Sequence, residues 1–184
     1  MTDMKQDGST VCNGGKNGNT NMEPARLFLV DVSVSPETAA AIADYIAVRG
    51  KMNVIRDMGV EPPVDSGEDH DQMERYLAAG IVQASCVLVL VSPARHEPWW
   101  LKRVAQLGRS AGVALALLTL KGASGPPGGS EAFERLRGIK SLNEYIFRLS
   151  PEVDRIIFNN PEYGGLMAHT APNHPLDAFL DWQH

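Results

Sequence analysis

The chain has 184 residues, of which 43% are hydrophobic and 21% are charged, so its composition is that of one globular domain. Its 17 Lys and Arg against 22 Asp and Glu give a net charge of -5, which argues against binding to nucleic acid or to a membrane surface. Cys12 and Cys86 are too few for a disulfide framework or a zinc site. Because no apolar run has the length of a membrane helix and residues 1–21 lack the apolar stretch of a signal peptide, we expect a cytoplasmic protein.

Composition divides the chain into three expected parts. Residues 1–24 are rich in Gly, Asn, Thr and Asp and hold few large apolar side chains, so we expect a flexible N-terminal tail. Residues 25–158 carry the apolar runs and predict one α/β domain. Residues 159–184 are rich in Gly, Pro, Asn and His and predict an irregular C-terminal extension, with a small amphipathic turn over residues 176–182.

The first half of the domain predicts two strands, each followed by a helix. Residues 27–30 are a continuous apolar run, which is typical of a strand buried on both faces. Ser35 and Pro36 predict a helix start, with Ser35 as N-cap, and Gly50 predicts its end. Next come a short strand over residues 52–57, a polar loop over residues 58–69, and a helix over residues 72–83.

The second half opens on the strongest strand pattern in the chain. Residues 86–91 (CVLVLV) are unbroken and β-branched, so we expect them at the centre of the sheet. A helix over residues 98–110 opens with Trp99 and Trp100, and a buried strand follows over residues 113–120. The remaining predicted elements are a Gly/Pro loop over residues 122–129, a short helix over residues 130–137, an edge strand over residues 144–149 and a short helix over residues 153–158.

The alternation of strands and helices predicts right-handed crossovers and a parallel sheet. The fold we expect is a flavodoxin-like three-layer α/β sandwich. Its sheet has five parallel strands in the order 2-1-3-4-5, and helices cover both faces.

Ligands of such sheets bind at the carboxyl ends of the strands, near the point between strands 1 and 3 where the strand order reverses. Polar and aromatic side chains follow three of the predicted strands there. Adjacent helical positions point about 100° apart. The two tryptophans therefore either diverge, so that one forms an aromatic wall for a flat ligand, or both cover the edge of the sheet. The side chains at this edge are Asp31 and Ser33 after the first strand, Asp57 after the second, and Ser92, Glu97, Trp99 and Trp100 after the third.

Several common catalytic motifs are missing. No GxxxxGK[ST] loop is present, and no GxGxxG follows a strand, which excludes the P-loop and dinucleotide-binding patterns. No GxSxG elbow indicates a serine hydrolase. His169, His174 and His184 lack the spacing of metal ligands, so we expect no metal site.

The order of the motifs resembles the Toll/interleukin-1 receptor (TIR) family over residues 26–150. A helix ending in an I-x-x-S/A turn, an apolar strand ending in Ser-Pro, and a tryptophan that opens the next helix are typical of that family. The matching segments are residues 27–33 for the first-strand box, 50–57 (GKMNVIRD) for the second strand, 58–69 for the BB loop, 81–85 for the helix end, 87–93 for the central strand, Trp99 or Trp100, and 136–139 before the last strand.

The resemblance implies either of two activities. Many bacterial and plant members cleave NAD at the bond between nicotinamide and ribose, whereas animal members mainly assemble with other TIR domains. Catalytic members carry a glutamate usually four residues after the tryptophan, where an anion can stabilise the oxocarbenium-like ribose. Counting from Trp99 gives Arg103 and counting from Trp100 gives Val104, so this acid is absent. Glu97 is the nearest carboxylate, and it is our candidate catalytic residue if the chain is an enzyme.

The resemblance also implies partners and ligands. We expect a homo-oligomer or assembly with other TIR-like domains, no resident cofactor, and NAD or a related nucleotide as a possible ligand or substrate. The candidate nucleotide-binding residues are Phe28, Asp31, Ser33, Asp57, Ser92, Trp99 and Trp100.

Three hypotheses follow. The first is a TIR-like domain of bacterial signalling or defence that binds partners or a nucleotide and lacks ordinary NAD cleavage. The second is an NAD hydrolase or cyclase that uses Glu97 or Asp31. The third is a pseudo-receiver domain with the same sheet, suggested by Asp31 and Lys121, although Ser92 stands where the phosphoacceptor aspartate should be.

Overall fold

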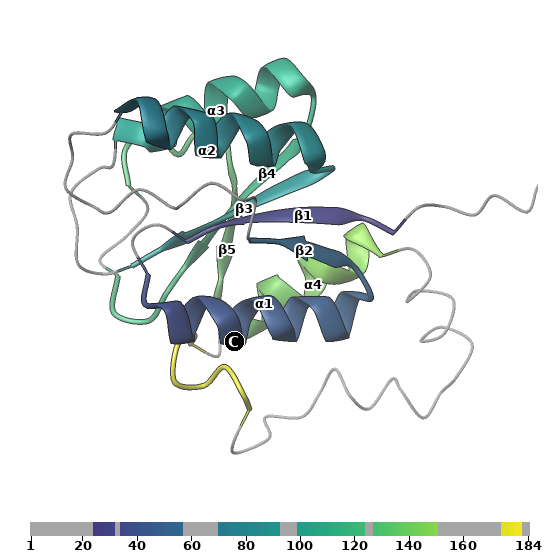
Figure 1. Cartoon of the computed structure of the whole chain (residues 1–184). Helices are drawn as coiled ribbons and strands as arrows, with labels where there is room; N and C mark the ends of the chain where they lie inside the picture. Colours follow the sequence, from purple (N-terminus) through teal and green to yellow (C-terminus); the bar gives the residue numbers. More distant parts are fainter. Residues whose placement is uncertain are drawn as a thin grey trace, which may run out of the picture.

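The structure is a computed structural model that describes residues 24–31, 34–56, 70–92, 99–123, 127–150 and 174–181. Within these ranges the chain forms five strands and four helices (Figure 1). The strands are β1 (Arg26–Val30), β2 (Asn53–Ile55), β3 (Cys86–Val91), β4 (Ala114–Thr119) and β5 (Glu134–Arg137). The helices are α1 (Pro36–Gly50), α2 (His70–Gln83), α3 (Trp99–Ala111) and α4 (Gly138–Leu149).

All four strand pairings are parallel, and the order is β2-β1-β3-β4-β5. This confirms the predicted topology, with β3 at the centre. The five side chains from Cys86 to Leu90 are fully buried, because helices cover both faces of the strand.

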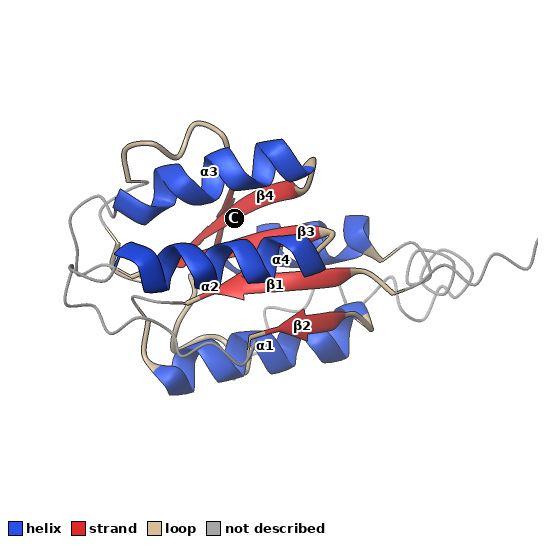
Figure 2. Cartoon of the chain, turned by 45° about the horizontal axis from the view of Figure 1, so that its top comes forward, coloured by secondary structure: helices blue, strands red, loops and turns tan. Residues whose placement is uncertain are grey.

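The helices form two layers (Figures 1 and 2). Helices α2 and α3 lie side by side on one face of the sheet, and α1 and α4 lie on the other. Each face has its own apolar core. Phe28 and Val89 point toward α2 and α3, whereas Leu29 and Leu88 point toward α1 and α4, because successive side chains of a strand alternate between faces. The protein is therefore a three-layer sandwich of flavodoxin-like topology.

Helix α1 begins and ends at the predicted residues, but the left-handed residue at its end is not a glycine. Ser35 is the N-cap, and its Oγ accepts a hydrogen bond from the backbone N–H of Thr38 at 3.3 Å. The helix ends at Gly50, but the left-handed residue is Lys51, with φ 48°. Gly50 is buried instead, and a Cβ there would lie close to the side chains of Met52 and Ile146.

The last two elements correct the sequence prediction. Residues 130–137 were expected as a helix and residues 144–149 as an edge strand, but the structure has β5 at Glu134–Arg137 followed directly by α4 at Gly138–Leu149. The buried positions Ile139, Leu142 and Ile146 follow helical spacing, which a window starting at residue 144 cannot show. No helix occurs in the described part of the β4–β5 connection, so the expected alternation also fails at this step.

A C-terminal segment, residues 174–181, packs on the α1–α4 face as a turn, which confirms the predicted turn over the part that is described. Leu176 and Leu180 have almost no exposed surface. The predicted N-terminal tail and the predicted helix over residues 153–158 lie outside the described residues.

Candidate functional site

The carboxyl ends of the strands meet at one edge of the sheet, and the first turns of α1, α2 and α3 lie at the same edge. Asp31 directly follows β1, Arg56 follows β2, and Ser92 follows β3. Strands β1 and β3 are neighbours whose outgoing connections lead to opposite faces, so the strand order reverses between them. This is the position at which flavodoxin-like sheets bind ligands.

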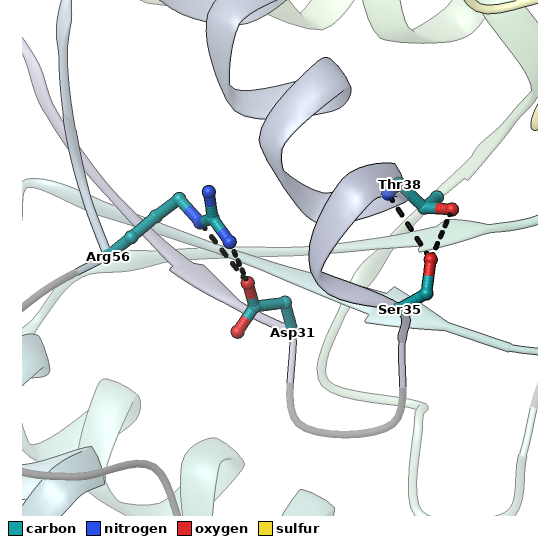
Figure 3. A network of polar contacts seen from close by, with 4 residues as sticks. All are labelled: Asp31, Ser35, Thr38 and Arg56. Atoms are coloured by element: carbon teal, nitrogen blue, oxygen red, sulfur yellow. Dashed lines mark hydrogen bonds and ion pairs between the residues drawn. The ribbon is translucent and has the colours of Figure 1, made fainter.

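An ion pair joins the ends of β1 and β2 at this edge (Figure 3). The Nε and Nη2 atoms of Arg56 donate to the same oxygen of Asp31, Oδ2, at 3.2 and 3.0 Å. The Asp31 side chain is 16% exposed and the Arg56 side chain 33%. The pairing of β1 with β2 brings the two residues together, since Phe28 is aligned with Ile55. The Asp31 carboxylate is thus neutralised by a guanidinium.

Tyr76 of α2 lies behind this pair. Burial, and secondarily the negative charge of Asp31, raise the pKa of the Tyr76 phenol far above its ordinary value, so the hydroxyl stays protonated. The Tyr76 ring packs against Phe28 of β1, with the ring centroids 5.5 Å apart. Phe28 has no exposed surface, so it supports the edge from within the core and offers no contact to a ligand in this conformation.

The two tryptophans at the start of α3 diverge. Trp100 is 5% exposed and packs in the core with Leu101, whereas Trp99 is 38% exposed. The Trp99 indole stacks on the imidazole of His70, the first residue of α2, with ring centroids 3.9 Å apart and an angle of 21° between the planes. Of the two arrangements left open by the sequence, the structure has the one in which a single indole faces outward.

One turn further along the same two helices, Arg103 of α3 forms an ion pair with Glu74 of α2. Arg103 is the residue four positions after Trp99, and Val104, four positions after Trp100, is fully buried in the core. Among the described residues, Glu74 is thus a carboxylate one helical turn from the His70–Trp99 pair, and it is bound to a guanidinium.

Three of the seven predicted nucleotide-binding residues lie at the described edge: Asp31, Ser92 and Trp99. Phe28 lies in the core. Trp100 is turned into the core. Ser33, Asp57 and the candidate catalytic residue Glu97 lie outside the described residues.

Sequence reasoning missed five residues that shape this edge. For two of them, His70 and Glu74, the sequence held a signal: they are four positions apart and so share one face of a helix. Trp99 and Arg103 have the same spacing. His70 was assigned to no element, because the predicted loop ended at residue 69 and the helix was expected to begin at residue 72. The five missed residues are Arg56, His70, Glu74, Tyr76 and Arg103.

Among the described residues, no group of three or more His, Cys, Asp or Glu side chains is arranged to hold a metal ion. No helix in the same ranges is both long and apolar enough to cross a bilayer.

Fold and edge together define a doubly wound α/β protein with a polar and aromatic rim at its switch point. Comparison of the chain with models of protein families, with curated proteins and with solved structures found no match in any of the three.

Proposed function

We propose that this chain is a TIR-like signalling domain that binds a nucleotide at the carboxyl edge of its sheet and does not cleave NAD. The sheet order agrees with the one expected for the resemblance. Ser92 follows the central strand and Trp99 begins the next helix, in the order in which the resembling motifs occur. These agreements support the proposal, and the chemistry of the edge refines it.

The pairing of the carboxylates is the observation that carries the proposal. Cleavage of NAD leaves a positively charged ribose, which needs an anion aimed at it in the transition state. Two of the described carboxylates at this edge are paired, Asp31 with Arg56 and Glu74 with Arg103. A carboxylate whose charge is already neutralised stabilises a cation poorly. Asp31 and Glu74 are therefore better suited to binding than to cleavage.

The same edge offers groups suited to a nucleotide. Trp99 and His70 form an exposed aromatic pair where α2 and α3 begin, and purine rings stack on such side chains. The guanidinium of Arg56 is partly exposed and suits a phosphate oxygen. The start of α1, the positive end of its helix dipole, also lies at this edge.

Calorimetry with the full chain tests the nucleotide site, with NAD and ADP-ribose as separate probes. We expect both to bind, and we expect Trp99→Ala to weaken binding by the stacking of one base, about 1–3 kcal/mol, or roughly five- to hundredfold in Kd. Val82→Ala is the matched control, because Val82 is another exposed apolar residue at the opposite end of α2. Absence of binding, or equal affinity of Trp99→Ala and the unaltered chain, contradicts the proposal.

NAD cleavage by an unusual carboxylate is the second candidate, favoured by the position of Asp31 at the switch point. Under this alternative, Glu97→Gln or Asp31→Asn abolishes nicotinamide release, and unchanged turnover in both variants rules it out. The pseudo-receiver alternative is supported less, because Ser92 follows β3 where an acidic phosphoacceptor is needed and Lys121 lies 3.7 Å from Asp181. Self-association stays a prediction, which light scattering of the full chain checks.

A further inference from the structure

Residues 174–181, here called the C-terminal segment, are anchored on the α1–α4 face of the sheet, opposite to the face that carries His70 and Trp99 (Figure 1). Two backbone bonds hold its far end: the N–H of Lys121 donates to the carbonyl of Phe179 at 2.8 Å, and the N–H of Ile139 donates to the carbonyl of Asp181 at 3.0 Å. Leu176 fills part of the core between these helices and the sheet. The segment thus satisfies a donor at the start of α4 and covers apolar surface.

The near end of the C-terminal segment is held by His174. Its Nδ1 atom accepts a hydrogen bond from the backbone N–H of Leu176 at 3.1 Å, which requires that Nδ1 carry no proton. Its Nε2 atom lies 3.1 Å from the hydroxyl of Tyr45 on α1, and that hydroxyl donates its own proton to Oδ1 of Asn143 on α4 at 2.7 Å. Nε2 is therefore the donor to Tyr45, and the docked imidazole is neutral.

The charges around His174 come from two elements. Arg49 of α1 opposes a second proton on the ring, and Asp177 of the segment itself favours it. Asp177 also accepts the backbone N–H of His174 at 2.8 Å. Among the described residues, the hydroxyl of Tyr45 also faces the ring, and burial raises the pKa of that phenol, so it stays neutral. Burial of the imidazole is the largest effect, and the pKa of His174 is lowered in the docked state.

We propose that the C-terminal segment is a proton-released latch: protonation of His174 at Nδ1 breaks its bond with the Leu176 N–H and frees the segment from α1 and α4. Docking is complete above the ordinary histidine pKa, where both the docked and the free imidazole are neutral. As the pH falls below that ordinary value, the free imidazole gains a proton before the docked one does, so docking weakens until the pH reaches the lowered docked value. Release uncovers the apolar surface beneath Leu176 and Leu180.

Hydrogen exchange of the full chain, followed residue by residue by NMR, tests the latch. Between about pH 7.5 and about pH 5.5, we expect the protection factors of the Lys121 and Ile139 amides to fall, by up to tenfold for each pH unit below the ordinary histidine value. The imidazole of His174 is titrated in the same sample, and the two midpoints should coincide. The amides of the central strand β3 should keep their protection, because the domain itself stays folded.

Two variants sharpen the test. His174→Asn supplies a side-chain oxygen that can accept the Leu176 N–H without titrating, so its protection at Lys121 and Ile139 should not vary with pH. His70→Asn is the matched control, since it removes an imidazole on the opposite face of the sheet. It should leave the pH dependence of the Lys121 and Ile139 protection unchanged. If the segment of His174→Asn is already undocked at neutral pH, the test rests on the unaltered chain. There, the latch requires that the midpoint of the His174 titration coincide with that of the loss of amide protection. Protection that is unchanged while His174 titrates, or an equal pH response in His174→Asn, overturns the latch.

Discussion

Replacing Phe28 with alanine is expected to lower the free energy of unfolding by about 3–5 kcal/mol. The Phe28 ring has no exposed surface and lies between β1 and α2, against Tyr76 and directly beneath Gly80. Truncation removes the buried apolar surface of the ring and leaves a cavity. The paired strand β1 and the helix α2 cannot move far enough to fill that cavity. Urea unfolding followed by circular dichroism measures the loss as a lower midpoint at an unchanged m-value.

Phe28→Leu is the control for this prediction, because it keeps most of the apolar volume and should cost less than the alanine variant. The same variant separates the two roles considered for Phe28. If the residue acts only through the core, Phe28→Leu binds nucleotide with the affinity of the unaltered chain. A loss smaller than about 1 kcal/mol in Phe28→Ala would show that the ring is not a principal core contact.

The second large effect concerns Gly80, one of the buried residues of α2. In an exposed helix interior, a change from glycine to alanine stabilises by about 1 kcal/mol. Here a Cβ would lie less than 3.0 Å from three ring carbons of Phe28, which is fixed between strand and helix. Gly80→Ala is therefore expected to reverse that sign and to destabilise the protein by about 1–3 kcal/mol in the same urea assay.

Gly108→Ala on α3 is the matched control for Gly80→Ala. Its Cβ would also lie within 3.0 Å of a neighbour, but that neighbour is a terminal methyl of Leu115, which can rotate away. We expect Gly108→Ala to be close to neutral, and the double variant Phe28→Leu/Gly80→Ala to recover part of the loss. Equal effects of the two glycine substitutions, or no recovery in the double variant, would contradict this account of the packing.

Much of the fold was predictable because its signals are local. The run of residues 86–91 identifies the central strand by its continuous hydrophobicity, and Ser35 with Pro36 identifies the start of α1. Burial on both faces is the physical reason for such runs in a parallel sheet. The order 2-1-3-4-5 followed from these elements together with the handedness of crossovers.

The end of the domain was misread for a physical reason. Residues 144–149 mix polar and apolar side chains over a window too short to distinguish a strand from a helix. The helical period becomes clear only when Ile139 and Leu142 are included. Gly138, at φ 75°, lets the chain turn directly from β5 into α4 without a loop that would mark the boundary.

At the candidate site, the position was predictable and the pairing was not. The switch point follows from the topology, so Asp31, Ser92 and Trp99 could be assigned to the edge before any contact was known. The pairing of Asp31 with Arg56 depends on the alignment of β1 with β2, and that of Glu74 with Arg103 on how α2 packs beside α3. Neither relation can be read from spacing along the chain, yet both decide whether a carboxylate is available for catalysis.

Proton NMR of the full chain incubated with NAD tests the central claim, that this edge binds a nucleotide without cleaving it. The account predicts that the indole N–H signal of Trp99 shifts on addition of NAD while free nicotinamide forms no faster than in buffer alone. Nicotinamide that accumulates in proportion to protein and disappears in Glu97→Gln would contradict the account, as would a Trp99 signal that stays in place at saturating NAD.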